Sequence, residues 1–297
     1  MQSLTLKSYG KVNLGLQVLG KRKDGYHEIE TILATIDLHD EITLTRSDKG
    51  IRVKSDNKTL PSQRRNLAYR AAELLLKEKG VREGVEIFIH KRIPVGVGLG
   101  GWSSNGATVL KGLLQLYEIP CSNRDLLEMA KELGSDLPFF LKGGVALAKG
   151  RGEILFPLSL PSPIWFVLVF PGFPISTLWA YQNLDLTIPS RSLKILTRSV
   201  ERGDLYTLAE KLVNSFEEVM FREYPVLKVV KERLLRHGAL GASLSGSGSS
   251  IFGICEDEDS ALRIASHISP SEFSEEKSEF FVVVTKTVRE VQEDGDH

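Results

Sequence analysis

A glycine-rich stretch between an apolar segment and a helical run most constrains how this chain can fold. Residues 96–101 hold four glycines in six positions, and the paired serines Ser103 and Ser104 follow. Glycine adopts positive φ and lets a backbone approach a ligand closely, because it has no Cβ. Amide N–H groups exposed at the start of a helix bind phosphate oxygens. The sequence therefore predicts a strand, a phosphate-binding turn and a helix, in that order.

Two familiar phosphate loops do not account for this stretch. It has no Gly-Lys-Ser/Thr end, so it is not a Walker A loop. Gly96, Gly98 and Gly101 fit the dinucleotide pattern G-x-G-x-x-G, which belongs in the first strand–helix unit with an acidic residue about 20 residues further on. Here the loop lies a third of the way along the chain, and Glu118 belongs to a predicted helix end. A tight turn without a ligand remains the alternative.

Composition limits the classes of partner and compartment. Lys plus Arg and Asp plus Glu number 38 each, so the bulk charge gives no reason to expect nucleic acid or an anionic membrane. Cys121 and Cys255 form neither a metal spacing nor a disulfide framework. With no signal peptide at the N-terminus, we expect a reducing, cytoplasmic setting. The longest apolar run, residues 164–170, is too short to cross a membrane.

Strands and helices are mixed without strict βαβ alternation, which predicts an α+β, two-domain, layered architecture. Strands are expected in the first 60 residues and at 85–90, 164–170, 251–255 and 280–285. Helices are expected at 67–79, 104–117, 123–133, 192–201, 204–216, 225–237 and 258–268. Asn66 and Asn123 are the expected N-caps of two of them. A proline-rich connector at 156–163 divides the chain into domains at 1–155 and 156–288, with an acidic tail at 289–297.

Three segments resemble motifs of the GHMP kinases, a superfamily of ATP-dependent small-molecule kinases. The glycine-rich loop resembles their phosphate loop, residues 11–16 their first motif, and residues 245–250 their third. One subfamily matches more closely, the one that phosphorylates 4-diphosphocytidyl-2-C-methyl-D-erythritol. Its opening resembles residues 20–28, and its Gly-x-Asp-x-Pro-Phe-Phe motif resembles residues 134–140. These matches follow one another in order and cover most of the chain.

The resemblance implies a two-domain GHMP kinase fold, with the active site in the cleft between the domains. It also implies transfer of the γ-phosphate of ATP, with Mg²⁺, to the 2-hydroxyl of the acceptor, as a step of non-mevalonate isoprenoid synthesis. Asp136 would be the catalytic base, and Lys11 would favour its ionised form. Period-two alternation places Lys11 and Asn13 on one strand face, which suits a shared substrate role. The alternatives are a helix cap for Asp136 and a solvated strand lysine for Lys11.

The other site residues implied by the resemblance divide between the nucleotide and the acceptor. ATP would contact Pro94, Gly96, Gly98, Leu99, Gly100, Gly101, Ser103, Ser104 and Asn66. Ser103 and Ser104 are also candidate Mg²⁺ ligands. The acceptor, a small molecule carrying a cytidine diphosphate group, would contact Asn13, Tyr26, His27, Thr177, Tyr181, Gly246, Ser247 and Gly248. Aromatic side chains suit stacking on a base. The alternatives are an ordinary surface position for Tyr26 and His27, core packing for Tyr181, and a flexible linker for residues 246–248.

Two other functions remain open at this point. A GHMP kinase for another alcohol, such as homoserine or mevalonate, would not need the Tyr26-His27 pair. A nucleotide sensor without turnover would not need both Lys11 and Asp136. The sequence predicts no particular oligomeric state and no protein partner.

Overall fold

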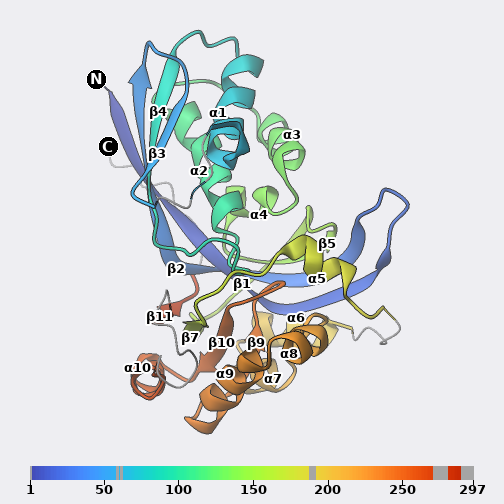
Figure 1. The fold of residues 1–297 in the computed structure, drawn as a ribbon. Helices are drawn as coiled ribbons and strands as arrows, with labels where there is room; N and C mark the ends of the chain where they lie inside the picture. Colours follow the sequence, from blue (N-terminus) through green and yellow to red (C-terminus); the bar gives the residue numbers. More distant parts are fainter. Residues whose placement is uncertain (1, 58–59, 61–62, 187–191, 270–279, 289–297) are drawn as a thin grey trace. The chain divides into compact units, whose positions relative to one another are not determined.

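The computed structural model describes residues 2–57, 60, 63–186, 192–269 and 280–288. The chain divides into two compact units, each assembled from separate stretches of sequence. The first holds the residues up to Gly10, with Leu38–Val95 and Gly100–Lys142, and the second holds Lys11–Asp37, Gly96–Leu99 and the residues from Gly143 onward. The long strands β1 (Ser3–Lys21) and β2 (His27–Ser47) therefore contribute to both units (Figure 1).

The first unit packs helices against one face of a sheet (Figure 1). The second half of β2 pairs antiparallel with β4 (Gly84–His90), which pairs parallel with β3 (Arg52–Ser55). The helices are η1 (Gln63–Arg65), α1 (Leu67–Glu78), α2 (Gly101–Leu116), α3 (Asn123–Leu133) and α4 (Leu137–Lys142). Apolar side chains at alternate positions of β2, such as Ile42 and Leu44, are fully buried beneath these helices. The core of this unit thus follows from period-two patterning in the strands.

The second unit contains two sheets. In one, the first half of β2 pairs with β5 (Val145–Gly150), β5 pairs with β6 (Ile154–Leu158), and β1 pairs parallel with β8 (Val213–Asn214). The other is antiparallel, with the order β11 (Phe281–Lys286), β7 (Trp165–Phe170), β10 (Ile251–Cys255) and β9 (Gly241–Leu244).

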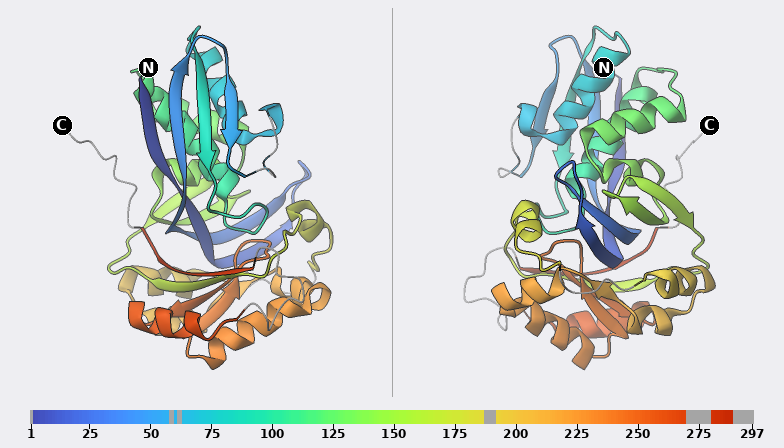
Figure 2. Two further views of the ribbon diagram at one scale, coloured as in Figure 1. Left: turned by 60° about the vertical axis from the view of Figure 1, so that its left-hand side comes forward. Right: turned by 90° about the vertical axis from the view of Figure 1, so that its right-hand side faces the viewer.

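The second unit holds six helices within the described residues. They are α5 (Thr177–Gln182), α6 (Lys194–Arg202), α7 (Leu205–Glu210), α8 (Glu217–Glu223), α9 (Pro225–Arg236) and α10 (Glu258–Ser266). Of these, α7, α9 and α10 pack against the antiparallel sheet, with α9 against β9 and β10 and α10 against β7 (Figure 2). Strand β7 is buried at nearly every position, which explains why the run at 164–170 is apolar throughout.

The predicted α+β class is confirmed, but local expectations are wrong where tertiary pairing overrides the local pattern. The helix expected at 204–216 ends at Glu210, since Val213 and Asn214 pair with β1. The connector expected at 156–163 begins later, since β6 continues to Leu158. Pro157 fits there because β6 is an edge strand, where a missing N–H is tolerated. The domain boundaries stay predictions, and 289–297 lies outside the described residues.

The cap of α3 is also not the expected one. The side chain of Ser122, rather than Asn123, accepts a hydrogen bond from a backbone N–H of the first turn, that of Asp125, at 3.1 Å. We expect Ser122→Ala to lower the free energy of unfolding by about 1 kcal/mol, since an orphan N–H of the helix loses its partner. Asn123→Ala is the matched control and should leave the urea midpoint nearly unchanged. An equal loss in both variants would contradict the assignment of the cap.

Candidate active site

The glycine-rich loop connects β4 to α2 and uses its glycines as the sequence predicts. Gly96, Gly98 and Gly100 have φ of 72°, 84° and 69°, in the left-handed region that other residues rarely adopt. Gly100 precedes the first residue of α2, and among the described residues no side chain caps this helix. The first backbone N–H groups of α2 are therefore available to an anionic ligand.

Helix α2 begins at Gly101, three residues earlier than the expected 104–117, so both serines lie in its first turn. The two differ in exposure. Ser104 is 2% exposed, and its hydroxyl accepts a hydrogen bond from Ser8 Oγ at 2.8 Å. Ser103 is half-buried and is the more accessible of the pair. Ser103 is thus better placed than Ser104 to meet a ligand.

Helix packing brings the starts of α1 and α4 against α2. A Cβ added at Gly106 would lie 3.1 Å from Leu137 Cδ2 and 3.1 Å from Leu67 Cγ, so glycine permits this close approach. Asn66 immediately precedes α1, and its side chain accepts from Ala68 N at 2.9 Å, as expected of an N-cap. Asp136 immediately precedes α4 and is half-buried, while the four residues that follow it are buried. Asp136 therefore lies at the edge of the apolar core that begins with α4.

Lys11 is the centre of a buried hydrogen-bond network in the second unit. Its side chain is on β1 and the residue is only 4% exposed, with the ammonium donating to Asn13 Oδ1 at 2.6 Å and to the Gly98 carbonyl at 2.8 Å. The shared strand face predicted for Lys11 and Asn13 is confirmed by this contact. The amide of Asn13 donates to Thr31 Oγ1 at 2.8 Å, and that hydroxyl donates to the Gly15 carbonyl at 2.7 Å. Each hydrogen bond thus fixes the orientation of the next side chain in the network.

The turn between β9 and β10 packs against Lys11 and Gly98 of the same network. Gly246 and Gly248 have φ of 58° and 94°, and a Cβ at Gly246 would lie 3.3 Å from Lys11 Nζ. The Ser245 hydroxyl donates to the Gly98 carbonyl at 3.0 Å, and a Cβ at Gly98 would lie 2.0 Å from the Ser245 carbonyl oxygen. Residues 243–250 are buried throughout. This turn is therefore a packed element and not the flexible linker that was the alternative.

Aromatic side chains gather where β1 turns into β2. Tyr26 is 54% exposed, and the Arg151 guanidinium lies over its ring at 4.7 Å from the centroid. His27 stacks on Tyr181 of α5, with centroids 4.8 Å apart and an interplanar angle of 24°. Burial lowers the pKa of His27, and the nearby Lys21 charge lowers it further. Both effects favour the neutral imidazole, in which one nitrogen donates and the other accepts a hydrogen bond.

The sequence-predicted residues thus form separate groups within the units. Lys11, Asn13, Gly98 and Gly246 are brought together, as are His27 and Tyr181. The hydroxyls of Thr177 and Ser247 are 3.1 Å apart. Ser245 belongs to a recognised motif, whereas Thr31 and Arg151 stand outside every motif, so no local signal could have identified them.

The remaining predicted residues belong to the loop or to its flanks. Pro94 and Leu99 lie in the loop itself, and the carbonyl of Leu99 accepts from Lys11 N at 2.9 Å.

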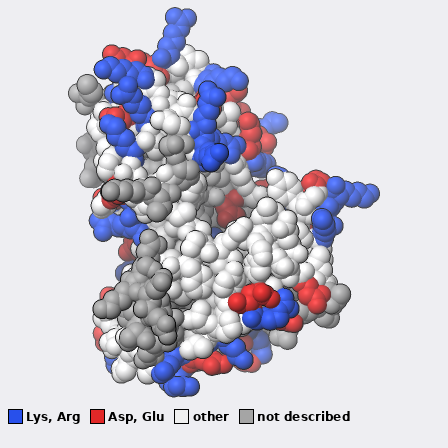
Figure 3. Space-filling view, in the orientation of Figure 1, with Lys and Arg blue, Asp and Glu red and all other residues white. Residues whose placement is uncertain are grey.

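Among the described residues, no group of three His, Cys, Asp or Glu side chains is arranged to hold a metal ion. Blue and red side chains are interspersed on the face drawn in Figure 3, in keeping with the equal counts of the two signs.

Comparison with known proteins agrees with this fold and these motifs. The family model of the GHMP kinases N-terminal domain matches residues 66–144, and that of the GHMP kinases C-terminal domain matches residues 196–275. Together they cover more than half of the chain, so the fold and the loop define a GHMP kinase. No helix within the described ranges is both long and apolar enough to cross a membrane.

Individual relatives narrow the assignment. The chain is 44% identical to the 4-diphosphocytidyl-2-C-methyl-D-erythritol kinase of Alkaliphilus metalliredigens over 86% of this chain and 88% of the relative. It is 42% identical to the enzyme of the same name from Geobacter metallireducens, over 97% and 100% of the two chains. A crystal structure of 4-(cytidine 5'-diphospho)-2C-methyl-D-erythritol kinase superimposes with a TM-score of 0.80 at 36% identity, over 96% of this chain and 100% of that one. The chain therefore belongs to the family of 4-diphosphocytidyl-2-C-methyl-D-erythritol kinases, and the predicted GHMP kinase fold and kinase class are confirmed.

Proposed function

We propose that this chain transfers the γ-phosphate of ATP to the 2-hydroxyl of 4-diphosphocytidyl-2-C-methyl-D-erythritol, giving the 2-phosphate and ADP in isoprenoid precursor synthesis. Family membership supports the reaction. The observation that links the reaction to particular residues is the position of Lys11. Its ammonium is buried and donates a hydrogen bond to the Gly98 carbonyl of the glycine-rich loop. A lysine at this place is suited to offset charge on a phosphoryl group in transfer.

The glycine-rich loop and the start of α2 would hold the triphosphate. Left-handed glycines turn the backbone there, and the uncapped N–H groups of α2 are suited to phosphate oxygens. Ser103 and Ser104 are the proposed hydroxyl contacts, with Ser103 the more accessible, and Asn66 is proposed to lie near the adenine. Mg²⁺, when bound, would neutralise charge on the β- and γ-phosphates; it binds mainly through phosphates and water, so few protein ligands are needed.

Asp136 is proposed as the base of the reaction. Its carboxylate would accept the proton of the 2-hydroxyl while the hydroxyl oxygen bonds to the γ-phosphorus and the bond from that phosphorus to ADP breaks. Lys11 would stabilise the ionised carboxylate and the charge on the transferred group. Most of the rate enhancement would come from positioning and electrostatics, as in other phosphoryl transfers.

The cytidine diphosphate group is proposed to bind near the aromatic residues of the β1–β2 turn. Tyr26 offers an exposed ring for stacking, and the neutral imidazole of His27 is suited to hydrogen bonding with a neutral base. Tyr181 would support His27 by the stacked contact between their rings. Asn13, Thr177 and the turn that contains Gly246, Ser247 and Gly248 are the other proposed acceptor contacts.

The first test is ADP release from Mg-ATP with four acceptors: 4-diphosphocytidyl-2-C-methyl-D-erythritol, homoserine, mevalonate and galactose. We expect turnover with the cytidyl acceptor alone. Turnover only with another alcohol would keep the kinase chemistry and overturn the acceptor. A lack of turnover with all four, in protein that still binds Mg-ATP, would instead support a nucleotide sensor.

The aromatic contact gives a more specific prediction. Tyr26→Ala is expected to raise the KM of the cytidyl acceptor by about tenfold, because stacking on a base contributes about 1–3 kcal/mol, and to leave the KM of ATP unchanged. Steady-state kinetics with each substrate varied in turn measures both constants. Tyr206→Ala, which removes another exposed tyrosine, is the matched control and should change neither. An unchanged acceptor KM in Tyr26→Ala would exclude base stacking on this ring.

A further inference from the structure

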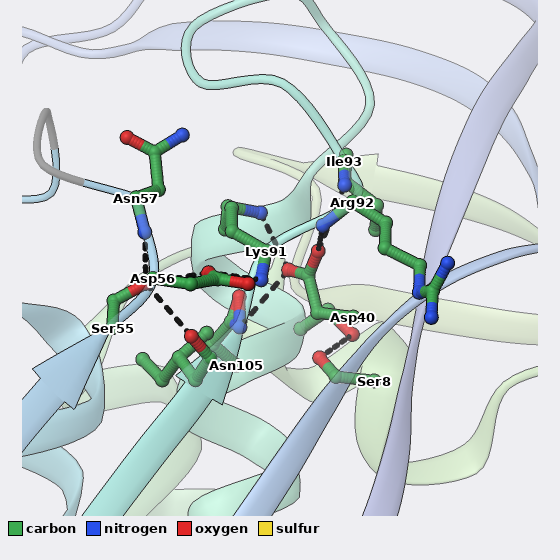
Figure 4. Close-up of polar contacts among 11 residues, drawn as sticks. Ser8, Asp40, Ser55, Asp56, Asn57, Lys91, Arg92, Ile93 and Asn105 are labelled. Carbon is green, nitrogen blue, oxygen red and sulfur yellow. Dashed lines mark hydrogen bonds and ion pairs between the residues drawn. The ribbon is translucent and has the colours of Figure 1, made fainter.

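A fully buried carboxylate lies at the base of the glycine-rich loop, in the first unit (Figure 4). Asp40 is on β2 and is 0% exposed. Its Oδ1 accepts from the backbone N–H groups of Arg92 and Ile93, both at 2.8 Å. Its Oδ2 accepts from Lys91 Nζ at 2.5 Å and from Asn105 Nδ2 at 3.1 Å. Four donors therefore converge on this one side chain.

These donors come from the two ends of the loop. Ile93 is the last residue before Pro94, where the glycine-rich stretch begins, and Asn105 lies in the second turn of α2, where the stretch has ended. Strand β4 ends at His90, so the N–H groups of Arg92 and Ile93 follow the last residue of the strand. Through these hydrogen bonds, Asp40 connects the backbone that precedes the loop to helix α2, which follows it.

Neighbouring contacts hold the same segment. Asp56 accepts from the backbone N–H of Lys91 at 2.9 Å, so three successive N–H groups of residues 91–93 are paired with carboxylates. A Cβ added at Gly101 would lie 3.1 Å from Lys91 Nζ and 3.1 Å from Ile93 Cγ2. The first residue of α2 therefore rests directly on the Lys91 side chain, and any shift of that side chain reaches the start of the helix.

A buried ion pair is an expensive way to gain stability alone. The side chains of Lys91 and Asp40 are 2% and 0% exposed, and burial lowers the pKa of Lys91 while the Asp40 charge opposes that change. Taking two charges out of water costs several kcal/mol per ion, and apolar replacements are often neutral or stabilising. What the pair supplies, and an apolar pair would not, is directed hydrogen bonding to both ends of the loop.

We propose that Asp40 is a positioning residue for nucleotide binding, which fixes the separation and direction of the two ends of the glycine-rich loop. This inference rests on the proposed role of that loop in holding ATP. Asp40 itself touches no substrate; it acts through Ile93 and Asn105. Its loss should therefore weaken Mg-ATP binding and leave the acceptor KM unchanged.

The direct test is Asp40→Asn, with the Kd of Mg-ATP measured by titration calorimetry on the full chain. We expect the Kd to rise about tenfold, which corresponds to the net contribution of a hydrogen bond to a charged group. Asn105→Leu leaves the ion pair intact and removes only the link to α2, so it tests the proposal even where Asp40→Asn fails to fold. Its expected rise is about fivefold, since a single hydrogen bond is lost.

Arg46→Gln is the matched control for a purely structural effect. Arg46 is on the same strand as Asp40, and its guanidinium donates to the Leu116 carbonyl at 2.6 Å, at the opposite end of α2. This variant should lower the melting temperature without changing the Kd of Mg-ATP. The same result in Asp40→Asn and Asn105→Leu, lower stability with unchanged ATP affinity, would overturn the inference.

Gly96→Ala distinguishes a failure of the proposed role of Asp40 from a failure of the assignment of the glycine-rich loop as the ATP site. Alanine at φ of 72° is strained, so this variant perturbs the loop directly. A weaker Mg-ATP complex in Gly96→Ala but not in Asp40→Asn or Asn105→Leu would overturn the anchoring role and keep the loop as the nucleotide site. Unchanged ATP affinity in all three would overturn the loop assignment, and the inference with it.

Discussion

Replacing Asp136 by asparagine is expected to lower kcat by about 10²–10⁴-fold, the contribution of a positioned base to proton transfer. Asparagine has the shape of aspartate but does not accept the hydroxyl proton. The KM of ATP should change little, because the proposed role concerns the acceptor hydroxyl. ADP release at saturating concentrations of both substrates measures the effect.

Asp125→Asn is the matched control for this experiment. Asp125 lies in the first turn of α3 and is exposed, so Asp125→Asn removes an equivalent charge from the same unit and should leave kcat unchanged. Thermal unfolding of both variants checks that the fold is intact. Full turnover in Asp136→Asn would show that another group, or water, accepts the proton.

Lys11→Met is expected to lower kcat by about 10²–10³-fold, as the loss of a preorganised charge stabiliser does in other enzymes. Methionine fills a similar volume, so packing on β1 is largely kept, while Asn13 Oδ1 and the Gly98 carbonyl lose their shared donor. Single-turnover kinetics separate this loss in the chemical step from any change in substrate binding.

A matched lysine distinguishes catalysis from general charge. Lys149 of β5 pairs with Glu30 at the surface, at 3.0 Å, and Lys149→Met should leave kcat unchanged. A drop in melting temperature without a drop in kcat in Lys11→Met would assign Lys11 to the structural network of Asn13 and Thr31 alone.

Local signals predict the parts of the fold that depend on neighbours in sequence. The glycine-rich loop, the cap at Asn66 and the apolar strand at 164–170 follow from backbone freedom, capping and burial, each of which acts over a few residues. Strand β8 does not, because only its partner β1 makes Val213 and Asn214 extended. Asn214 Nδ2 then donates to the carbonyls of Leu244 and Gly246, which ties this short strand to the turn beside Lys11.

The candidate site shows the same division. Lys11 and Asn13 are two residues apart, so strand alternation alone places them on one face. Asp40 and Lys91 are 51 residues apart, and nothing in either neighbourhood indicates that they meet. Buried polar pairs of this kind depend on the packing of complete elements, which periodicity does not encode.

The shared strands β1 and β2 have a consequence for how the chain is made. Residues 11–37 belong to the second unit, yet most of that unit begins at Gly143, after the first unit is complete in sequence. During synthesis, this early hairpin leaves the ribosome long before β5, its partner in the sheet, exists. Because this pairing is distant in sequence, we expect this sheet of the second unit to form late in folding. For the same reason, no single cut of the chain releases either unit whole.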